Sequence, residues 1–221
     1  MSDFPSLLLL TFFFVVYVGD IIMLMAYDRQ KYIDALNLQL EPNIVRHSLA
    51  LEACMGALYD YFQSQGQLGQ NEPSKEDWLL AGLIHDVDFG GEFKEFHPAK
   101  TREALAKYGL EISDVVFKIV QAHALRQNVV YENKAEWSIL CADSLTGLII
   151  AVALILPSRK LADVKLSSIM KRFLKEPKFA AGTRRDEVKM CEKPEGLNTP
   201  LQKFIEICFL SMQKVAPALG L

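Results

Sequence analysis

Residues 78–86 read Trp-Leu-Leu-Ala-Gly-Leu-Ile-His-Asp, an apolar stretch that ends in the dipeptide His85-Asp86. Ser74, with Asp77 three residues later, resembles a helix N-cap followed by an acidic first turn, so a helix is predicted to begin there and end at the dipeptide. Imidazole and carboxylate together suit divalent metals such as Mn, Fe, Co, Ni and Zn. The stretch therefore predicts a helix that presents two candidate metal ligands.

The chain has only four histidines, and each lies on or beside a segment that reads as helix. His47 precedes the dipeptide, and His97 and His123 follow it. Asp143 comes next, within an apolar stretch of its own. Because imidazole and carboxylate are ligands for the same divalent ions, these residues are candidate ligands of one metal centre.

Helical periodicity dominates the chain from residue 26 onward, and no stretch shows convincing strand alternation. Pro98 is expected at the first position of its helix, and Thr199 with Gln202 is expected to form a capping box. The apolar residues 145–156 are too few to span a bilayer, which indicates a buried core helix. An all-α fold is predicted, with helices over residues 28–36, 44–62, 75–86, 98–108, 114–123, 135–156, 166–174, 184–191 and 201–216.

Composition narrows the class of protein. A chain of 221 residues suffices for one sizeable domain, and its net charge of −3 argues against a stable nucleic-acid partner. The four cysteines are widely spaced and form no C-x-x-C pair, so reduced thiols in the cytoplasm are expected. Cys54, Cys141 and Cys208 lie in apolar helical contexts and are predicted to be small core residues.

Residues 1–25 form a hydrophobic leader, and residues 26–221 are predicted to be the folded domain. The apolar run over residues 7–25 is about long enough to cross a bilayer, although Asp20 interrupts it. If the run is a membrane anchor, Arg29 and Lys31 after it predict that the domain faces the cytoplasm. The alternatives are a spurious or dispensable extension upstream of a start at Met23 or Met25, or a core helix.

The order of histidines and aspartates resembles the HD-domain superfamily of metal-dependent phosphohydrolases. The resemblance covers nearly all of residues 26–221. It rests on Arg46-His-Ser-Leu-Ala-Leu-Glu, on Ala81-Gly-Leu-Ile-His-Asp-Val-Asp and on Ala142-Asp-Ser-Leu-Thr-Gly-Leu. It implies an all-helical HD-domain bundle that holds a divalent ion through His47, His85, Asp86 and Asp143.

The resemblance to the two-metal branch of this superfamily adds a second ion, so one or two ions are expected per chain. His97 and His123 occupy the matching places for the second ion, and Asp86 would bridge the pair. Asp88 is expected to orient a ligand or the attacking water. Candidate cations for the substrate phosphate, each with a solvated surface charge as the alternative, are Lys94, Arg126, Arg159, Lys160, Arg184 and Arg185.

The chemistry of phosphate ester hydrolysis agrees with this ligand set, because a divalent ion lowers the pKa of bound water and polarises the phosphate. We therefore expect a metal-dependent phosphohydrolase that acts on a nucleotide or another small phosphorylated metabolite. The chain carries no Gly-Tyr-Pro motif, which disfavours cyclic dinucleotides. The alternatives are a di-iron oxygenase of the same superfamily and a non-catalytic metal or nucleotide sensor, tethered to a membrane if residues 7–25 are an anchor.

Overall fold

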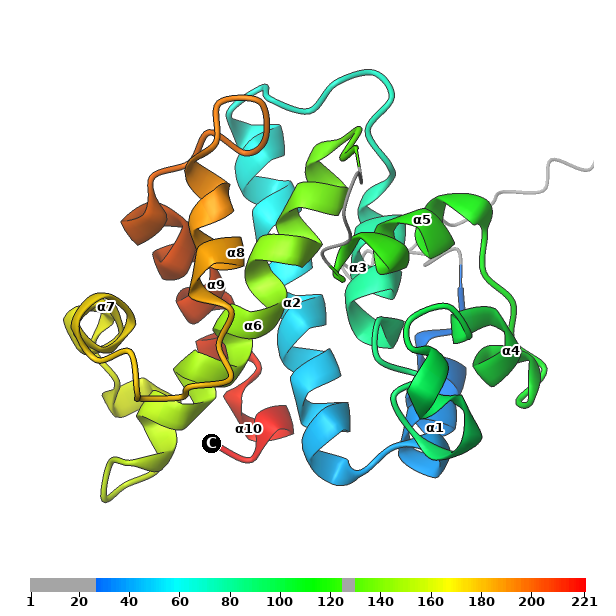
Figure 1. Ribbon diagram of the computed structural model, residues 1–221, viewed down its shortest axis with the longest axis horizontal. Helices are drawn as coiled ribbons and strands as arrows, with labels where there is room; N and C mark the ends of the chain where they lie inside the picture. The colour runs from blue at the N-terminus through cyan, green and yellow to red at the C-terminus, as the bar shows by residue number, and fades with distance from the viewer. Residues whose placement is uncertain (1–26, 125–129) are drawn as a thin grey trace, which may run out of the picture.

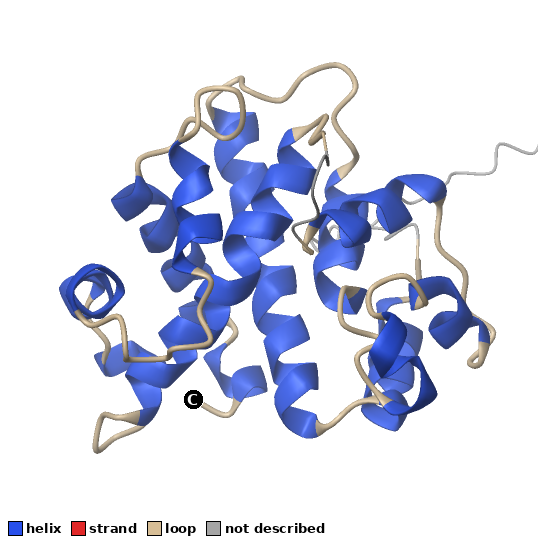
Figure 2. Ribbon diagram, viewed as in Figure 1, coloured by secondary structure: helices blue, strands red, loops and turns tan. Residues whose placement is uncertain are grey.

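The computed structural model describes residues 27–124 and 130–221, and this part of the chain is all-α, as predicted (Figure 2). Its helices are joined by turns and loops, with no strand among the described residues. The predictions for the leader and for Arg126 lie outside these ranges. The α-helices up to residue 214 are α1 (Arg29–Gln39), α2 (Pro42–Ser64), α3 (Lys75–Ile84), α4 (Thr101–Ala106), α5 (Asp114–Ala122), α6 (Lys134–Leu154), α7 (Leu166–Lys175), α8 (Arg185–Lys189) and α9 (Leu201–Lys214).

The remaining helical segments are short. They are the 3₁₀ turns η1 (Gly91–Phe96), η2 (Leu161–Asp163) and η3 (Met190–Glu192), and the final turn α10 (Ala216–Leu219). Helix η1 lies between the predicted helices over residues 75–86 and 98–108. At its start a Cβ on Gly90 would lie 2.5 Å from the carbonyl oxygen of Gln39, so only glycine lets the chain pass this close to α1.

Helices α2 and α6 form the centre of the molecule (Figure 1). Helix α2 packs against α3, α6 and α9, and α6 also packs against α5, α7 and α8. Among the described helices, α6 is the one long and apolar enough to cross a membrane, but most of its apolar stretch is buried against these neighbours. The prediction of a buried core helix is confirmed. All four cysteines are buried and unpaired, as expected for core residues.

Local capping explains where two of the site-bearing helices begin. The Ser74 hydroxyl accepts a hydrogen bond from the Asp77 amide, and the Asp77 carboxylate accepts one from the Ser74 amide at 3.0 Å. This reciprocal pair is the predicted capping box of α3. Ser113 caps α5 by accepting from the Val116 amide at 3.1 Å. Helix α2 begins at Pro42 rather than at residue 44, which places His47 in its second turn.

The prediction that Pro98 is the first residue of a helix is wrong. The His97-Pro98 peptide is cis, and the chain makes turns over residues 97–100 before α4 begins at Thr101. The residue before a proline is disfavoured in the helical region, and His97 adopts φ −54° and ψ 137°. The Thr101 hydroxyl donates to the Pro98 carbonyl at 2.8 Å and closes the turn.

The predicted capping box over residues 199–202 is also wrong. Pro200 is the N-cap of α9, and no side chain caps the helix from that position. The Thr199 hydroxyl donates instead to the Leu197 carbonyl at 3.0 Å. The Glu192 carboxylate accepts from the Leu201 amide at 3.1 Å, so a residue distant in sequence takes over the capping role.

Candidate metal centre

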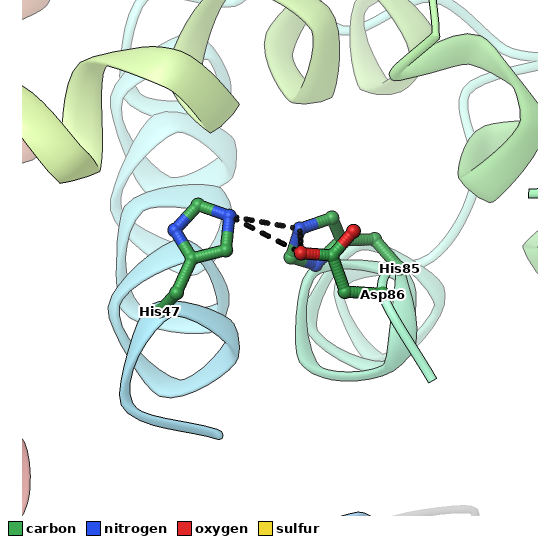
Figure 3. Close-up of side chains that lie close together, drawn as sticks. All are labelled: His47, His85 and Asp86. Carbon is green, nitrogen blue, oxygen red and sulfur yellow. Dashed lines mark hydrogen bonds and ion pairs between the residues drawn. The ribbon is translucent and has the colours of Figure 1, made fainter. Parts of the chain in front are cut away.

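The fold brings all six predicted ligands together. Their positions are the second turn of α2 (His47), the end of α3 (His85 and Asp86), the residue after η1 (His97), the C-cap of α5 (His123) and the middle of α6 (Asp143). Figure 3 shows the His47 ring reaching from α2 toward His85 and Asp86 beyond the end of α3. Separate elements thus position the ligands around one point.

The first group of ligands is formed by His47, His85 and Asp86, whose ligand atoms could hold one ion. The Nε2 atoms of His47 and His85 lie 3.1 Å apart. Oδ2 of Asp86 lies 3.2 Å from His85 Nε2 and 3.6 Å from His47 Nε2. Oδ1 of Asp143 approaches the same pair, at 2.9 Å from His47 Nε2 and 3.8 Å from His85 Nε2.

The second group is formed by Asp86, His97 and His123, and it could hold another ion. The Nε2 atoms of the two histidines lie 3.0 Å apart. The other carboxylate oxygen of Asp86, Oδ1, lies 3.4 Å from His97 Nε2 and 3.8 Å from His123 Nε2. Asp86 therefore directs one oxygen toward each histidine pair, the arrangement of a bridging ligand.

Two of the four imidazoles are oriented by backbone carbonyls. His85 and His123 each follow the last residue of a helix, where carbonyl groups have no intrahelical partner. Nδ1 of His85 lies 3.0 Å from the Gly82 carbonyl, and Nδ1 of His123 lies 2.5 Å from the Val120 carbonyl. Because a carbonyl can only accept, the hydrogen of each neutral ring is on Nδ1.

His97 is oriented by Asp88. Nδ1 of His97 lies 2.7 Å from Asp88 Oδ1, while Asp88 Oδ2 accepts from the Lys100 amide at 2.8 Å. The Asp88 side chain is fully buried, and both of its oxygens are used. Asp88 thus orients a candidate ligand, and a metal-bound histidine held by a carboxylate is a common arrangement in metal sites.

His47 is oriented by Thr146, a residue that the sequence interpretation missed. The Thr146 hydroxyl lies 2.8 Å from His47 Nδ1 and donates to the Asp143 carbonyl, also at 2.8 Å. Since its one hydrogen is used there, the hydroxyl accepts from His47 Nδ1. Thr146 lies three residues after Asp143 on α6, and this helical spacing is the signal that could have identified it.

The four imidazoles therefore present their Nε2 atoms to the centre. The Nε2 atoms lie 3.0–3.1 Å apart in each pair, and an Nε2 atom carries a lone pair when its ring is neutral with the hydrogen on Nδ1. Two lone pairs at this distance repel each other unless a proton or a metal cation lies between them. Imidazole and carboxylate donors converge at both pairs, so the residues present fit a divalent cation at each.

The charges at the centre also suit a cation. Burial acts to raise the pKa of Asp86, but the charge and hydrogen bond of His85, with the charge of His47, hold it well below its usual range. The Asp143 pKa is held low in the same way, mainly by His47. Burial, followed by the nearby His85, lowers the pKa of His123 to about 4. At neutral pH both carboxylates are ionised and His123 is neutral, as metal ligation requires.

The adjacent arginines at the start of α8 have different roles. Arg184 Nη2 donates to Asp143 Oδ2 at 2.6 Å, so this guanidinium reaches the site through a ligand. Arg185 points elsewhere, because its guanidinium donates to the backbone carbonyls of Phe173 and Phe179 at 3.1 and 2.6 Å. Arg185 thus fixes the loop that carries Arg184, and its predicted contact with substrate stays a prediction.

The other described cations lie farther from the ligands. Helix α6 continues for eleven residues beyond Asp143, roughly 16 Å at 1.5 Å per residue, before Arg159 and Lys160 follow it as exposed residues. Lys94 is exposed on η1, with Nζ 5.1 Å from the centre of the Phe89 ring. Phe89 in turn packs edge-on against His97, with ring centroids 5.2 Å apart. Lys94 is therefore connected to the second pair through Phe89, whereas no described hydrogen bond or ion pair joins Arg159 or Lys160 to a candidate ligand.

A cavity of about 290 Å³ opens beside the first histidine pair. Its walls are formed by α2, α6 and the loop before α8, and the lining residues are His47, Asp143, Ser144, Gly147 and residues 180–183. Two of these residues are candidate ligands. The cavity therefore gives a small molecule direct access to the candidate metal centre.

Comparisons with known proteins add no further information. No family model matches the chain, and neither a curated protein nor a solved structure matches it.

Proposed function

We propose that the protein is an HD-type, metal-dependent phosphohydrolase. The observation that carries this proposal is the position of Asp86, which directs one oxygen toward His47 and His85 and the other toward His97 and His123. Two ions about 3.5–4 Å apart, bridged by a carboxylate, are typical of sites that clamp the attacking and leaving oxygens of a phosphate ester. The ligand order along the chain, which resembles the HD-domain superfamily, supports the same assignment.

When bound, divalent ions at these pairs would supply an activated water and polarise the phosphate. The protein residues keep the site ready for that chemistry. His47, His85, Asp86 and Asp143 would hold one ion, and His97 and His123 would hold the other with Asp86. Fixed hydrogen bonds at all four Nδ1 atoms keep the rings oriented, so little reorganisation is needed when an ion binds.

The proposed substrate is a nucleotide or another small phosphorylated metabolite. The cavity at His47 and Asp143 has the volume of a small site, close to the lower end of typical ligand pockets. Lys94, placed near the second pair through Phe89, is available for the charge of a phosphate group. These features support a compact phosphate ester as the substrate.

The proposal is tested by hydrolysis of p-nitrophenyl phosphate and a panel of nucleotides, with and without Mn²⁺. We expect Mn²⁺-dependent release of phosphate. Asp86→Asn should lower turnover by more than the roughly 100-fold that loss of a ligand-orienting residue can cost. Asp163→Asn is the matched control, because this exposed aspartate lies on η2 and contacts no candidate ligand.

Two results would contradict the proposal. One is hydrolysis that is unaffected by Asp86→Asn, which would show that the activity does not depend on the bridging carboxylate. The other is oxygen consumption by an iron-loaded, mixed-valent form without any phosphate release, which would favour a di-iron oxygenase. Nucleotide binding without turnover in the presence of Mn²⁺ would favour a sensor.

A further inference from the structure

Asp143 has one carboxylate oxygen inside the candidate metal centre and one outside it. Oδ1 lies 2.9 Å from His47 Nε2, whereas Oδ2 lies 2.6 Å from Arg184 Nη2. We infer that Arg184 holds Asp143 as a ligand through a single oxygen, and so preserves space for substrate at the first pair. The inference rests on the proposed metal centre and assigns Arg184 as a positioning residue within it.

The Arg184 guanidinium is held on two sides. Nη2 bonds Asp143, and Nε bonds Glu187 Oε2 at 2.5 Å. Glu187 is itself buried, so its carboxylate is a fixed partner one turn along α8. Arginine can make both bonds because its N–H donors form a rigid planar fork, which a lysine ammonium lacks. The position of Arg184, and hence of Asp143 Oδ2, is therefore defined by geometry as well as by charge.

The loop that carries Arg184 is also fixed. The neighbouring Arg185 donates to three backbone carbonyls over residues 173–179, which ties the end of α7 to the start of α8. The same loop, residues 180–183, forms one wall of the cavity beside His47 and Asp143. Arg184 thus enters the site from a held loop at the place where a substrate would approach.

Freeing Asp143 Oδ2 would change the ligand set. Carboxylates bind metals through one oxygen or through both, and no other described contact holds Asp143 Oδ2. His47, His85, Asp86 Oδ2 and Asp143 Oδ1 already supply four donor atoms at this pair. A fifth donor from Asp143 would occupy the cavity side of the site, where water and a phosphate oxygen need room.

The test compares wild-type protein, Arg184→Ala and Arg184→Lys as full-length chains. Metal-depleted protein is titrated with Co²⁺, and affinity is read together with visible absorption, whose intensity falls as the coordination number rises. For Arg184→Ala we expect weaker Co²⁺ absorption, tighter binding of one ion because the freed carboxylate oxygen adds a donor, and a lower kcat. Arg184→Lys should change absorption in the same direction, because lysine keeps the charge but lacks the rigid planar fork that fixes the contacts with Asp143 and Glu187.

Arg102→Ala is the matched control, since Arg102 bonds the exposed Asp114 and no candidate ligand. It should leave the spectrum and the affinity unchanged. If Arg184→Ala has the Co²⁺ absorption and Co²⁺ affinity of the wild type and only its KM is raised, the inference is overturned. That result would favour direct contact between Arg184 and the substrate phosphate. Wild-type behaviour of Arg184→Lys would also overturn it, by showing that charge alone matters. Failure of wild-type protein to bind Co²⁺ would instead contradict the metal centre itself, and the inference with it.

Discussion

His123 shows how one buried side chain links the stability of this protein to pH. Burial, with the nearby His85, lowers the His123 pKa to about 4, against about 6.5 in an unfolded chain. Between these values the unfolded state binds more protons than the folded state, so the free energy of unfolding decreases as the pH falls from 6.5 to 4. A lowering of this size corresponds to a loss on the order of 3 kcal/mol for the metal-free protein.

The prediction is that His123→Asn removes most of this pH dependence. His47 acts in the opposite sense. Asp143 and Asp86 raise its pKa in spite of burial, so the stability that His47 contributes to the folded state is lost as the pH rises. Comparing the variant with the wild type isolates His123. The measurement is urea unfolding of the metal-free proteins at pH 7 and pH 5. An equal decrease in the free energy of unfolding of both proteins between pH 7 and pH 5 would contradict the assignment of this pH dependence to His123.

At the scale of single residues, the candidate ligands could be predicted from the sequence, whereas most of the residues that orient them could not. The six ligands were identified from residue type and order, and the fold brings all of them together. Thr146 was missed, although its spacing from Asp143 could have indicated it. The contact of Arg184 with Asp143 could not be predicted, because it joins segments 41 residues apart through a loop without periodicity.

At the scale of elements, the first turn of α6 is capped by a carboxylate from the loop before α3. Glu72 accepts hydrogen bonds from the amides of Lys134 and Ala135, at 3.1 and 2.9 Å, which otherwise have no intrahelical partner. We predict that Glu72→Ala lowers the free energy of unfolding by about 1–2 kcal/mol, the usual cost of losing a helix cap. The measurement is urea unfolding at pH 7.

The matched control is Glu95→Ala, since Glu95 is exposed on η1 and caps no helix. It should change the free energy of unfolding by less than about 0.5 kcal/mol. A Glu72→Ala variant as stable as this control would show that water replaces the lost contacts at the start of α6.

Helix starts were predictable where the local pattern is read correctly, whereas capping by a residue outside that pattern was not. Ser74 caps α3 through Asp77, as expected from the sequence. Helix α9 begins at Leu201 as predicted, but Glu192 takes the place of the predicted capping box. The segment after His97 turns before α4 begins, so the start of that helix was misplaced. The buried position of α6 was predictable, because a helix apolar on all sides must be covered by others.

At the scale of the whole molecule, the fold serves mainly to bring distant ligands together. The central helices α2 and α6 each carry one, and α3, η1 and α5 end at the others (Figure 1). The ligands converge closely, with the Nε2 atoms 3.1 Å apart in the first pair and 3.0 Å apart in the second. The assembled site is therefore expected to bind metal as part of its stable folded state.

The central claim is that one site holds two ions through Asp86. The most direct test is elemental analysis of metal content in the full-length protein after reconstitution with Mn²⁺, Fe²⁺, Co²⁺ or Zn²⁺. We predict about two ions per chain in the wild type, about one in His123→Ala, and none retained in Asp86→Ala. No bound metal in the wild type, or two ions retained in Asp86→Ala, would contradict the account.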